Sequence, residues 1–281
     1  MAHPTKNLAE GPSSPLQPSM DPILRWAGSK RKVLTTLRGV SPPSFERYIE
    51  PFAGSAVLYF DLLPDVAVLG DLNPEVVATY SAIRDSAKEV CDYLSSIPKT
   101  KEAYYTLREL KPELLTESQR AARLIFLMKA CFNGVYRTNR NGKFNVPLGS
   151  HFYALPSAED LISVSNQLKN TKLVCGDFAT TIGEAREGDF IYLDPPYSDG
   201  TRFRGEYSYK GAFQAPDLQR LISICRELTK RRVKILLSFK EHEELSINLS
   251  GWTVKKIAVT RSVAGFTHSR RTAREILAYN F

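Results

Sequence analysis

Residues 190–200 read FIYLDPPYSDG, an apolar run that ends abruptly in an acid, two prolines and a tyrosine. Proline fixes φ, carries no N–H and restrains the residue before it, so Pro195 and Pro196 predict a stiff turn at the end of a buried strand. Ligands bind beyond the carboxyl ends of the strands in open α/β sheets, so this turn indicates a site at Asp194. The alternative is an ordinary strand-terminating turn, because Asp-Pro pairs start turns routinely.

The same succession of strand, polar loop and helix recurs along the chain. RYIEPF at 47–52 leads into a helix-like AVLYFDLL, and VAVLGDLN at 66–73 leads into a second helix. Two such units in succession point to a doubly wound parallel sheet, so we expect an α/β fold. Later strand signals are TKLVCGDF at 171–178, VKILLSF at 233–239, WTVKKIAV at 252–259 and AREILAYNF at 273–281. The last two strands are joined late in the chain and suggest an antiparallel edge on the sheet.

Composition divides the chain into parts. Residues 1–20 are rich in Pro, Ser and Gly with few large apolar groups, so we expect a disordered tail. Residues 76–168 change to helical patterns, including ESQRAARLIFLMKACF, and to one hairpin, which predicts an inserted lobe. Residues 21–75 and 169–281 would then form the sheet domain that carries the chemistry.

Overall composition limits the class of protein and its partners. No apolar run approaches the ~18 residues of a membrane span and the N-terminus lacks an apolar signal-peptide core, so we expect a cytoplasmic protein. The net charge of +8 and the pI near 9.2 fit a polyanionic partner, with simple solubility as the alternative. Cys91, Cys131, Cys175 and Cys225 form no CxxC pair, so we expect no disulfide framework and no metal.

Acids and a glycine follow the predicted strands. Glu50 begins EPFAG, where Gly54 permits a tight turn or the close approach of backbone to a ligand before a helix. Asp71 ends the next strand, about where nucleoside-binding α/β folds place the acid that binds ribose hydroxyls. Neither GxGxxG nor GxxxxGK[ST] is present, which predicts a ligand with a ribose and without a pyrophosphate. S-adenosylmethionine fits that description.

Further residues complete the predicted cofactor pocket. Asp177 offers an acceptor to an exocyclic amine, Phe178 offers a face to a purine, and Lys30 offers a cation to an amino acid carboxylate. Each has a simpler explanation, because Phe52 and Trp26 suit a core and Lys30 belongs to a basic run that suits a solvated surface. The predicted cofactor-binding residues are Trp26, Ala27, Gly28, Lys30, Glu50, Pro51, Phe52, Ala53, Gly54, Ser55, Asp71, Asp177, Phe178 and Asp194.

The order and spacing of these motifs resemble a known family. WAGSK at 26–30, EPFAG at 50–54, NGVYRTNRNGKFNVPLG at 133–149, GDF at 176–178 and DPPY at 194–197 look like the Dam-type DNA adenine N6-methyltransferases, the α-group of the D12 class. The resemblance covers nearly the whole chain after the predicted tail. It implies a Rossmann-like, S-adenosylmethionine-dependent methyltransferase fold with a mostly parallel seven-stranded sheet and an inserted target-recognition domain.

One position departs from the family's FxGxG turn, which reads FAGSA here at 52–56. Ala56 adds a methyl group at the second glycine position. Because alanine fits wherever φ stays negative, we expect altered cofactor affinity with activity retained.

By this resemblance, the catalytic residues are Asp194, Pro195, Pro196 and Tyr197. Asp194 and the Pro195 carbonyl would accept the two hydrogens of an adenine amino group, which points the nitrogen lone pair at the methyl-sulfonium carbon. The transfer is then an in-line displacement catalysed by positioning and electrostatics. An adenine inside a duplex is out of reach, so the base must flip out, and Tyr197 is the stacking face.

The inserted lobe is the predicted DNA reader. The Asn-Gly pair at 141–142 predicts a hairpin, and a two-stranded ribbon can enter a major groove. There Arg137 could contact guanine while Val135 and Pro147 face a thymine methyl, with a solvated hairpin as the alternative. Phe132 and Asn133 could fill the space left by the flipped base. By resemblance to the family, Arg25 would contact the outer base of the site. A second basic segment, which contains Arg261, Arg270 and Arg271, would bind phosphates. The predicted DNA-binding residues are Arg25, Phe132, Asn133, Val135, Arg137, Asn139, Arg140, Lys143, Pro147, Arg261, Arg270 and Arg271.

Other functions remain open on the sequence. Cytosine N4-methylation uses the same proline-rich loop, although an Asp at its head favours adenine, and a protein or RNA methyltransferase is a third reading. A catalytically inactive DNA-binding module on the same fold is a fourth, against which the intact Asp194, Asp71 and Lys30 argue. The sequence does not reveal whether the target is GATC or another adenine-containing palindrome, whether a restriction enzyme accompanies the protein, or whether it is a monomer or a weak homodimer.

Overall fold

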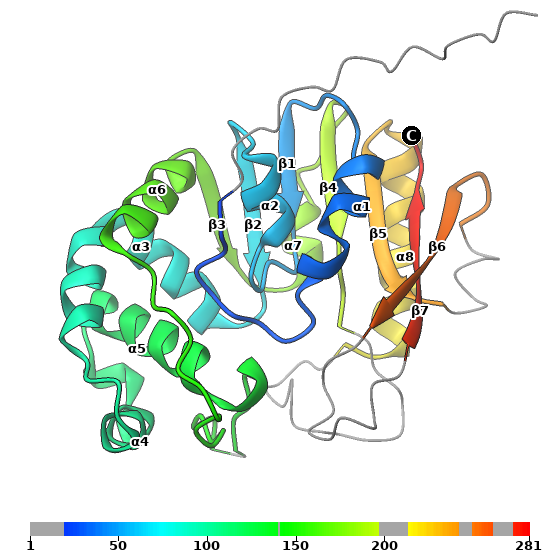
Figure 1. The fold of residues 1–281 in the computed structure, drawn as a ribbon. Coiled ribbons are helices and arrows are strands. Elements are labelled where there is room, and N and C mark those ends of the chain that lie inside the picture. The colour runs from blue at the N-terminus through cyan, green and yellow to red at the C-terminus, as the bar shows by residue number, and fades with distance from the viewer. Residues whose placement is uncertain (1–19, 140, 197–212, 242–248, 261–271) are drawn as a thin grey trace, which may run out of the picture.

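The computed structural model describes residues 20–139, 141–196, 213–241, 249–260 and 272–281. Within these residues, seven strands form one sheet in the order β3-β2-β1-β4-β5-β7-β6 (Figure 1). The strands are β1 Arg47–Glu50, β2 Ala67–Asp71, β3 Thr171–Cys175, β4 Asp189–Leu193, β5 Lys234–Lys240, β6 Thr253–Thr260 and β7 Thr272–Tyr279. Strand β7 pairs antiparallel with β5 and β6, and the other neighbouring pairs are parallel. The predicted mostly parallel sheet with an antiparallel edge is confirmed.

Helices cover both faces of the sheet. They are α1 Leu34–Val40, α2 Val57–Leu62, α3 Pro74–Ser96, α4 Lys101–Glu109, α5 Glu117–Ala130, α6 Ala158–Leu168, α7 Phe178–Ile182 and α8 Ala215–Lys230, with short 3-10 turns η1 Lys30–Val33, η2 Pro112–Leu114 and η3 Phe132–Gly134. Successive side chains of a strand point to opposite faces. Tyr48 and Phe190 therefore enter the core shared with α1 to α6, whereas Ile49 and Ile191 enter the core shared with α7 and α8. Burial on both faces explains why the residues in the middle of β1 and β4 are apolar.

The inserted segment forms part of the crossover from β2 to β3. Helix α3 begins at Pro74 because Asn73 caps it, its side chain accepting a hydrogen bond from the Glu75 N–H at 3.0 Å. Helix α6 ends at Leu168, three residues before β3. The predicted boundaries at 76 and 168 therefore fall just inside α3 and at the end of α6. Buried side chains of these helices belong to the same core as one face of the sheet.

The predicted hairpin lies between α5 and α6. Its pairing is reduced to isolated antiparallel bridges, Cys131 with Leu148 and Thr138 with Phe144. The turn is closed by backbone hydrogen bonds from Asn139 N to Lys143 O at 2.9 Å and from Asn145 N to Arg137 O at 3.1 Å. The hairpin is therefore present, but it is shorter than a regular two-stranded ribbon. Among the described residues, no helix is both long and apolar enough to span a membrane.

The topology places a binding crevice at a defined point. From β1 the chain proceeds to β2 and β3 on one side, and it returns to β4 and β5 on the other. The strand order reverses between β1 and β4, and ligands of open α/β sheets bind at the carboxyl ends of strands beside such a reversal.

Candidate active site

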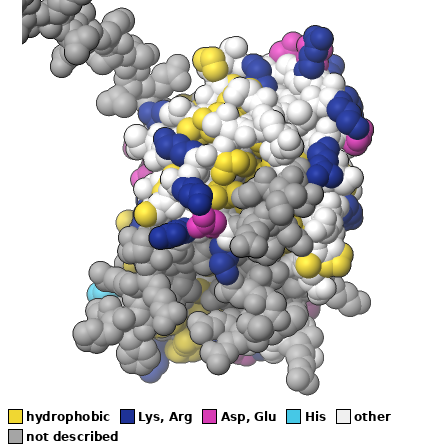
Figure 2. All heavy atoms as spheres, turned by 90° about the vertical axis from the view of Figure 1, so that its right-hand side faces the viewer, with side chains coloured by type: hydrophobic (Ala, Val, Ile, Leu, Met, Phe, Trp, Pro, Cys, Tyr) yellow, Lys and Arg dark blue, Asp and Glu magenta, His cyan; other side chains and the backbone are white. Residues whose placement is uncertain are grey.

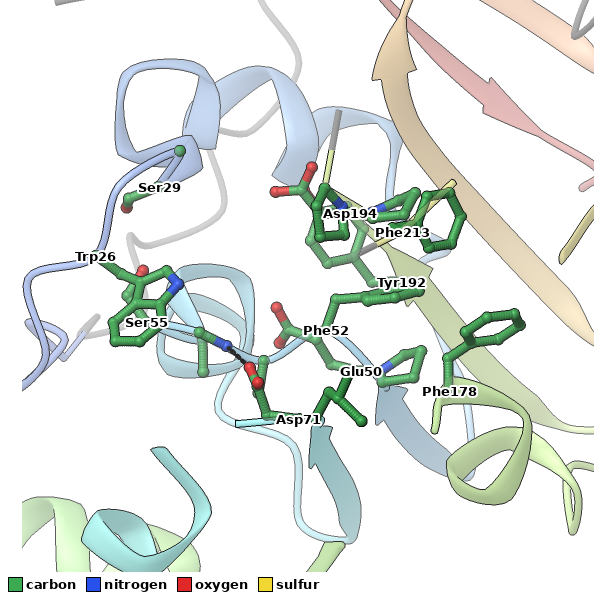
Figure 3. Close-up of a pocket in the computed structure, with 18 of the residues that line it drawn as sticks. Trp26, Ser29, Glu50, Phe52, Ser55, Asp71, Phe178, Tyr192, Asp194 and Phe213 are labelled. Atoms are coloured by element: carbon green, nitrogen blue, oxygen red, sulfur yellow. Dashed lines mark hydrogen bonds between the residues drawn. The ribbon is translucent and has the colours of Figure 1, made fainter. Parts of the chain in front are cut away.

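Three carboxylates meet at the strand ends beside this reversal. Glu50 ends β1, Asp71 ends β2, and Asp194 follows β4 directly. Because β2, β1 and β4 are adjacent and parallel, their final residues share one edge of the sheet. All three line a cavity of about 280 Å³. Figure 3 shows them between Trp26 at one end of the cavity and the rings of Phe178 and Phe213 at the other.

The structure brings the predicted cofactor residues together. Every one of them lines this cavity, as do Pro195 and Pro196. Other lining residues were not predicted from the sequence, and these are Ser29, Ala56, Val57, Leu72, Gly176, Tyr192, Phe213 and Asp217. Most of these adjoin a predicted motif, so neighbourhood alone could have suggested them. Phe213 lies just before α8, and Asp217 lies in its first turn. Neither residue belongs to a motif that the sequence reveals.

Gly54 and Trp26 form one wall of the cavity. The Gly54 N–H donates a hydrogen bond to Asp71 Oδ2 at 2.9 Å, which Figure 3 marks with a dashed line. Gly54 has a φ of +46°, and a β-carbon added there would lie 2.8 Å from Cδ1 of Trp26. The glycine is therefore needed both for its left-handed backbone and for the indole that lies against it.

Burial changes the acidity of two of the carboxyl groups. Asp71 accepts hydrogen bonds from the backbone N–H groups of Gly54 and Asn73, yet desolvation raises its pKa to about 6. Desolvation also raises the pKa of Glu50 well above its usual range, although a hydrogen bond from the Tyr48 hydroxyl opposes the shift. The nearby carboxylates of Asp194 and Asp71 add to the shift at Glu50. A cation in this cavity would stabilise the ionised forms.

Lys30 is paired with the predicted catalytic acid. Its Nζ lies 2.7 Å from Asp194 Oδ1 and 3.9 Å from Glu275 Oε2 on β7. Lys30 and Glu275 are buried, and Asp194 is mostly buried. The sequence predicts that the partner of Lys30 is a carboxylate of the cofactor. In the structure its ammonium group instead holds Asp194, so a cofactor carboxylate would have to share this cation.

Ala56 contradicts the expectation of a negative φ. It takes φ +48° and ψ 41°, a left-handed conformation, as the N-cap of α2. The cause is the tight turn after β1, in which the Ala56 N–H donates to Ala53 O at 2.6 Å. Ala56 is also fully buried. The alanine therefore carries the strain that a glycine would avoid, about 1–2 kcal/mol for an L-residue in this conformation.

Asp177 and Phe178 already have partners within the protein. Asp177 caps α7 by accepting from the Ala179 N–H at 2.9 Å, and its other oxygen accepts from Arg220 at 2.5 Å. The guanidinium carbon of Arg220 lies 4.4 Å from the centre of the Phe178 ring. Phe52 and Phe213 also pack against Phe178. A purine at this end of the cavity would meet an aromatic cluster closed on one side by Arg220.

The described residues of the predicted DNA reader lie in or next to the hairpin between α5 and α6. Arg137 donates from Nε to Asn145 Oδ1 at 2.7 Å across the hairpin, and Lys143 forms an ion pair with Glu109. Arg25 lies over the Tyr153 ring at 4.1 Å. Phe132, Asn133, Asn139 and Pro147 are exposed, and Val135 is half-buried. The Arg25 side chain also lies against Gly134, so it contacts the base of the hairpin.

Several predicted residues lie outside the described part of the chain. They are Tyr197, Arg140, Arg261, Arg270 and Arg271. On the described part of the face shown in Figure 2, Lys and Arg side chains are spread out and do not form one cluster. Among the described residues, no group of three or more His, Cys, Asp and Glu side chains could hold a metal ion.

Comparisons with family models and with curated proteins identify the family. The family model for D12 class N6 adenine-specific DNA methyltransferase matches residues 26–263. The Type II methyltransferase M1.LlaDCHI of Lactococcus lactis subsp. cremoris is 31% identical over 275 residues, which cover 94% of this chain and 96% of that protein. The DNA adenine methylase of Serratia marcescens is 26% identical over 79% of this chain and 84% of its own length. A solved putative methyltransferase, yhhF from Escherichia coli, aligns over 92% of each chain with a TM-score of 0.37 at 12% identity.

Proposed function

The chain belongs to the D12 class of N6 adenine-specific DNA methyltransferases, and on that premise we propose that it methylates a flipped-out adenine within a short duplex site. The observation that carries the proposal is the meeting of Glu50, Asp71 and Asp194 around one cavity with Asp194-Pro195-Pro196 at its rim. This arrangement combines a nucleoside-sized cavity with a rigid set of acceptors, and both are needed to methylate an exocyclic amine.

The residues present fit S-adenosylmethionine. Asp71 is an acceptor suited to ribose hydroxyls, and the aromatic cluster of Phe52, Phe178 and Phe213 suits a purine. Three carboxylates in one cavity suit a ligand that carries positive charge on its sulfonium and its ammonium group. When bound, the cofactor supplies the electrophilic methyl group.

The protein's own contribution is to hold the adenine amino group. Asp194 and the Pro195 carbonyl would accept its two hydrogens, which increases electron density on a nitrogen whose lone pair is otherwise delocalised into the ring. Lys30 fixes one oxygen of Asp194 at 2.7 Å, so the other oxygen is held in a defined direction. Catalysis then rests on positioning and on preorganised charge, and no strong base is required.

We assign target recognition to residues 76–168 together with Arg25. What supports this is that the Arg25 side chain lies against Gly134, and that Tyr136 of the hairpin stacks on Trp26, which lines the cavity. In this proposal Arg137 contacts a guanine and Phe132 fills the space of the flipped base. GATC and other adenine-containing palindromes are both compatible with these groups.

The test is to express the protein in a host without adenine methylation and to map modified bases by single-molecule sequencing. We expect N6-methyladenine in one short motif. N4-methylcytosine, or no modified base from a protein that folds, would refute the proposal. A companion Asp194→Asn variant should lose at least about 100-fold in turnover and should still bind S-adenosylmethionine in calorimetry. Asp65→Asn, at an exposed carboxylate between α2 and β2 that does not line the cavity, is the matched control and should retain full turnover.

A further inference from the structure

Trp26 lies between the cofactor cavity and the hairpin. It lines the cavity, and its indole lies against Gly54. The Tyr136 ring stacks on it with a centroid distance of 5.4 Å and an interplanar angle of 23°. Tyr136 does not line the cavity and belongs to the hairpin, one residue before Arg137. One aromatic pair therefore joins the cavity wall to the segment predicted to read DNA.

Tyr136 also lies close to Asn73. Burial raises the pKa of the Tyr136 phenol to about 12, and the Asn73 side chain opposes that rise. Asn73 also donates its backbone N–H to Asp71 Oδ1 at 2.8 Å, and Asp71 lines the cavity. On its other side, Tyr136 packs against Phe144 of the hairpin with ring centroids 5.7 Å apart. Both edges of the hairpin therefore connect to the cavity through Tyr136.

The base of the hairpin is fixed by the residue next to Trp26. Asn133 and Gly134 have φ of +55° and +63° in succession, and a β-carbon on Gly134 would lie 2.8 Å from the Arg25 side chain. Arg25 thus fills the space that the glycine leaves. Because Arg25 and Trp26 are consecutive, a shift of Trp26 toward or away from Gly54 also shifts the contact between Arg25 and the hairpin.

We propose that Tyr136 is a positioning residue that couples the two ligands, so that cofactor in the cavity orders the hairpin and each ligand strengthens the binding of the other. This inference rests on the proposed function of the cavity and the hairpin. Binding energies coupled through a protein are reciprocal, so the factor by which cofactor strengthens DNA binding equals the factor by which DNA strengthens cofactor binding.

The experiment measures that factor in a thermodynamic cycle. S-adenosylhomocysteine, which cannot be turned over, is titrated with and without a duplex that carries the methylated motif, and the duplex is titrated with and without S-adenosylhomocysteine. We expect coupling of about 5-fold or more in the unaltered protein. A stacked aromatic pair is worth about 2- to 10-fold in an equilibrium constant, so Tyr136→Ala should lower the coupling by that factor. Tyr136→Phe keeps the ring and should retain the coupling.

Phe281→Ala is the matched control. Phe281 is an exposed aromatic residue whose ring packs against Tyr279 with centroids 5.4 Å apart, and it lies outside residues 76–168 and does not line the cavity. It should leave the coupling unchanged. Unchanged coupling in Tyr136→Ala, or no coupling in the unaltered protein, would overturn the inference while leaving methylation intact. A protein that binds no S-adenosylhomocysteine would instead refute the proposed function.

Discussion

Replacement of Gly54 by alanine tests how the wall of the cavity is built. An L-residue at a φ of +46° costs about 1–2 kcal/mol, and the smaller entropy of the unfolded alanine chain returns about 0.4–1 kcal/mol. The new β-carbon would lie 2.8 Å from Trp26 Cδ1, and overpacking of this kind costs about 1–3 kcal/mol more. We therefore expect Gly54→Ala to lower the free energy of unfolding by roughly 1–5 kcal/mol.

The same substitution should weaken cofactor binding. Relief of the collision must displace Trp26 or the Gly54 backbone, whose N–H is bonded to Asp71, and all three groups line the cavity. Because misplacement of binding groups by even small distances is costly, we expect calorimetry to show at least about a tenfold loss of affinity for S-adenosylmethionine.

Gly251→Ala provides the control for backbone strain alone. Gly251 has a φ of +85°, and a β-carbon there meets nothing within 4 Å. It should cost about 1 kcal/mol and leave cofactor affinity unchanged. Urea unfolding followed by circular dichroism is the suitable assay, because Trp252 adjoins Gly251 and would complicate fluorescence. If Gly54→Ala matches Gly251→Ala within about 0.5 kcal/mol and binds cofactor normally, the indole does not constrain this position.

Three further predictions follow from individual contacts. Asp71 should ionise near its pKa of about 6. The affinity for S-adenosylmethionine should therefore be constant above that pH and should fall by up to about tenfold per pH unit below it. Calorimetry at several pH values should show that Asp71→Asn abolishes this dependence. The pKa of Asp71 in the folded protein exceeds its ordinary value of 3.8. The contribution of Asp71 to the free energy of unfolding should therefore fall by on the order of 3 kcal/mol as the pH rises from about 4 to 6. Arg47→Met should cost about 3–5 kcal/mol in urea unfolding, because Arg47 pairs at 2.7 Å with Asp189, whose side chain is fully buried. Arg137→Ala should cost about 1–3 kcal/mol in DNA binding and relax specificity at one base pair of the methylated motif, whereas an equal loss on all sequences would assign Arg137 to phosphates.

The fold and the cofactor cavity were predictable because they depend on local patterns. Asp194 and Asp71 each come at the end of an apolar strand. When such a strand joins a parallel sheet, its acid takes a defined place at the carboxyl edge of that sheet. The strands β2 and β4 both pair with β1, so their carboxyl ends bring those two acids to one edge of the sheet, although they are more than a hundred residues apart in the sequence. Motif residues that follow strands were therefore placed correctly without knowledge of any side-chain contact.

The side-chain partners were not predictable, because tertiary packing decides them. Nothing near Lys30 in the sequence indicates that it pairs with Asp194, and nothing near Asp177 indicates Arg220 on α8. The backbone conformation of Ala56 was likewise not predictable from the sequence. Alanine ordinarily signals a negative φ, but here the turn between β1 and α2 imposes a positive one.

The pairing of Lys30 with Asp194 bears on how the cavity tolerates its own charge. Glu50, Asp71 and Asp194 line one cavity, where desolvation raises the pKa of Glu50 and of Asp71, and the carboxylates of Asp194 and Asp71 add to the shift at Glu50. Asp194 differs from these two neighbours because a cation lies beside it, with Lys30 Nζ 2.7 Å from its Oδ1. Opposite charges at this distance attract, so Lys30 offsets the repulsion between Asp194 and the other two carboxylates. In the proposed reaction, the cation of the WAGSK motif therefore holds one oxygen of Asp194 in place and leaves the other to accept from the adenine amino group.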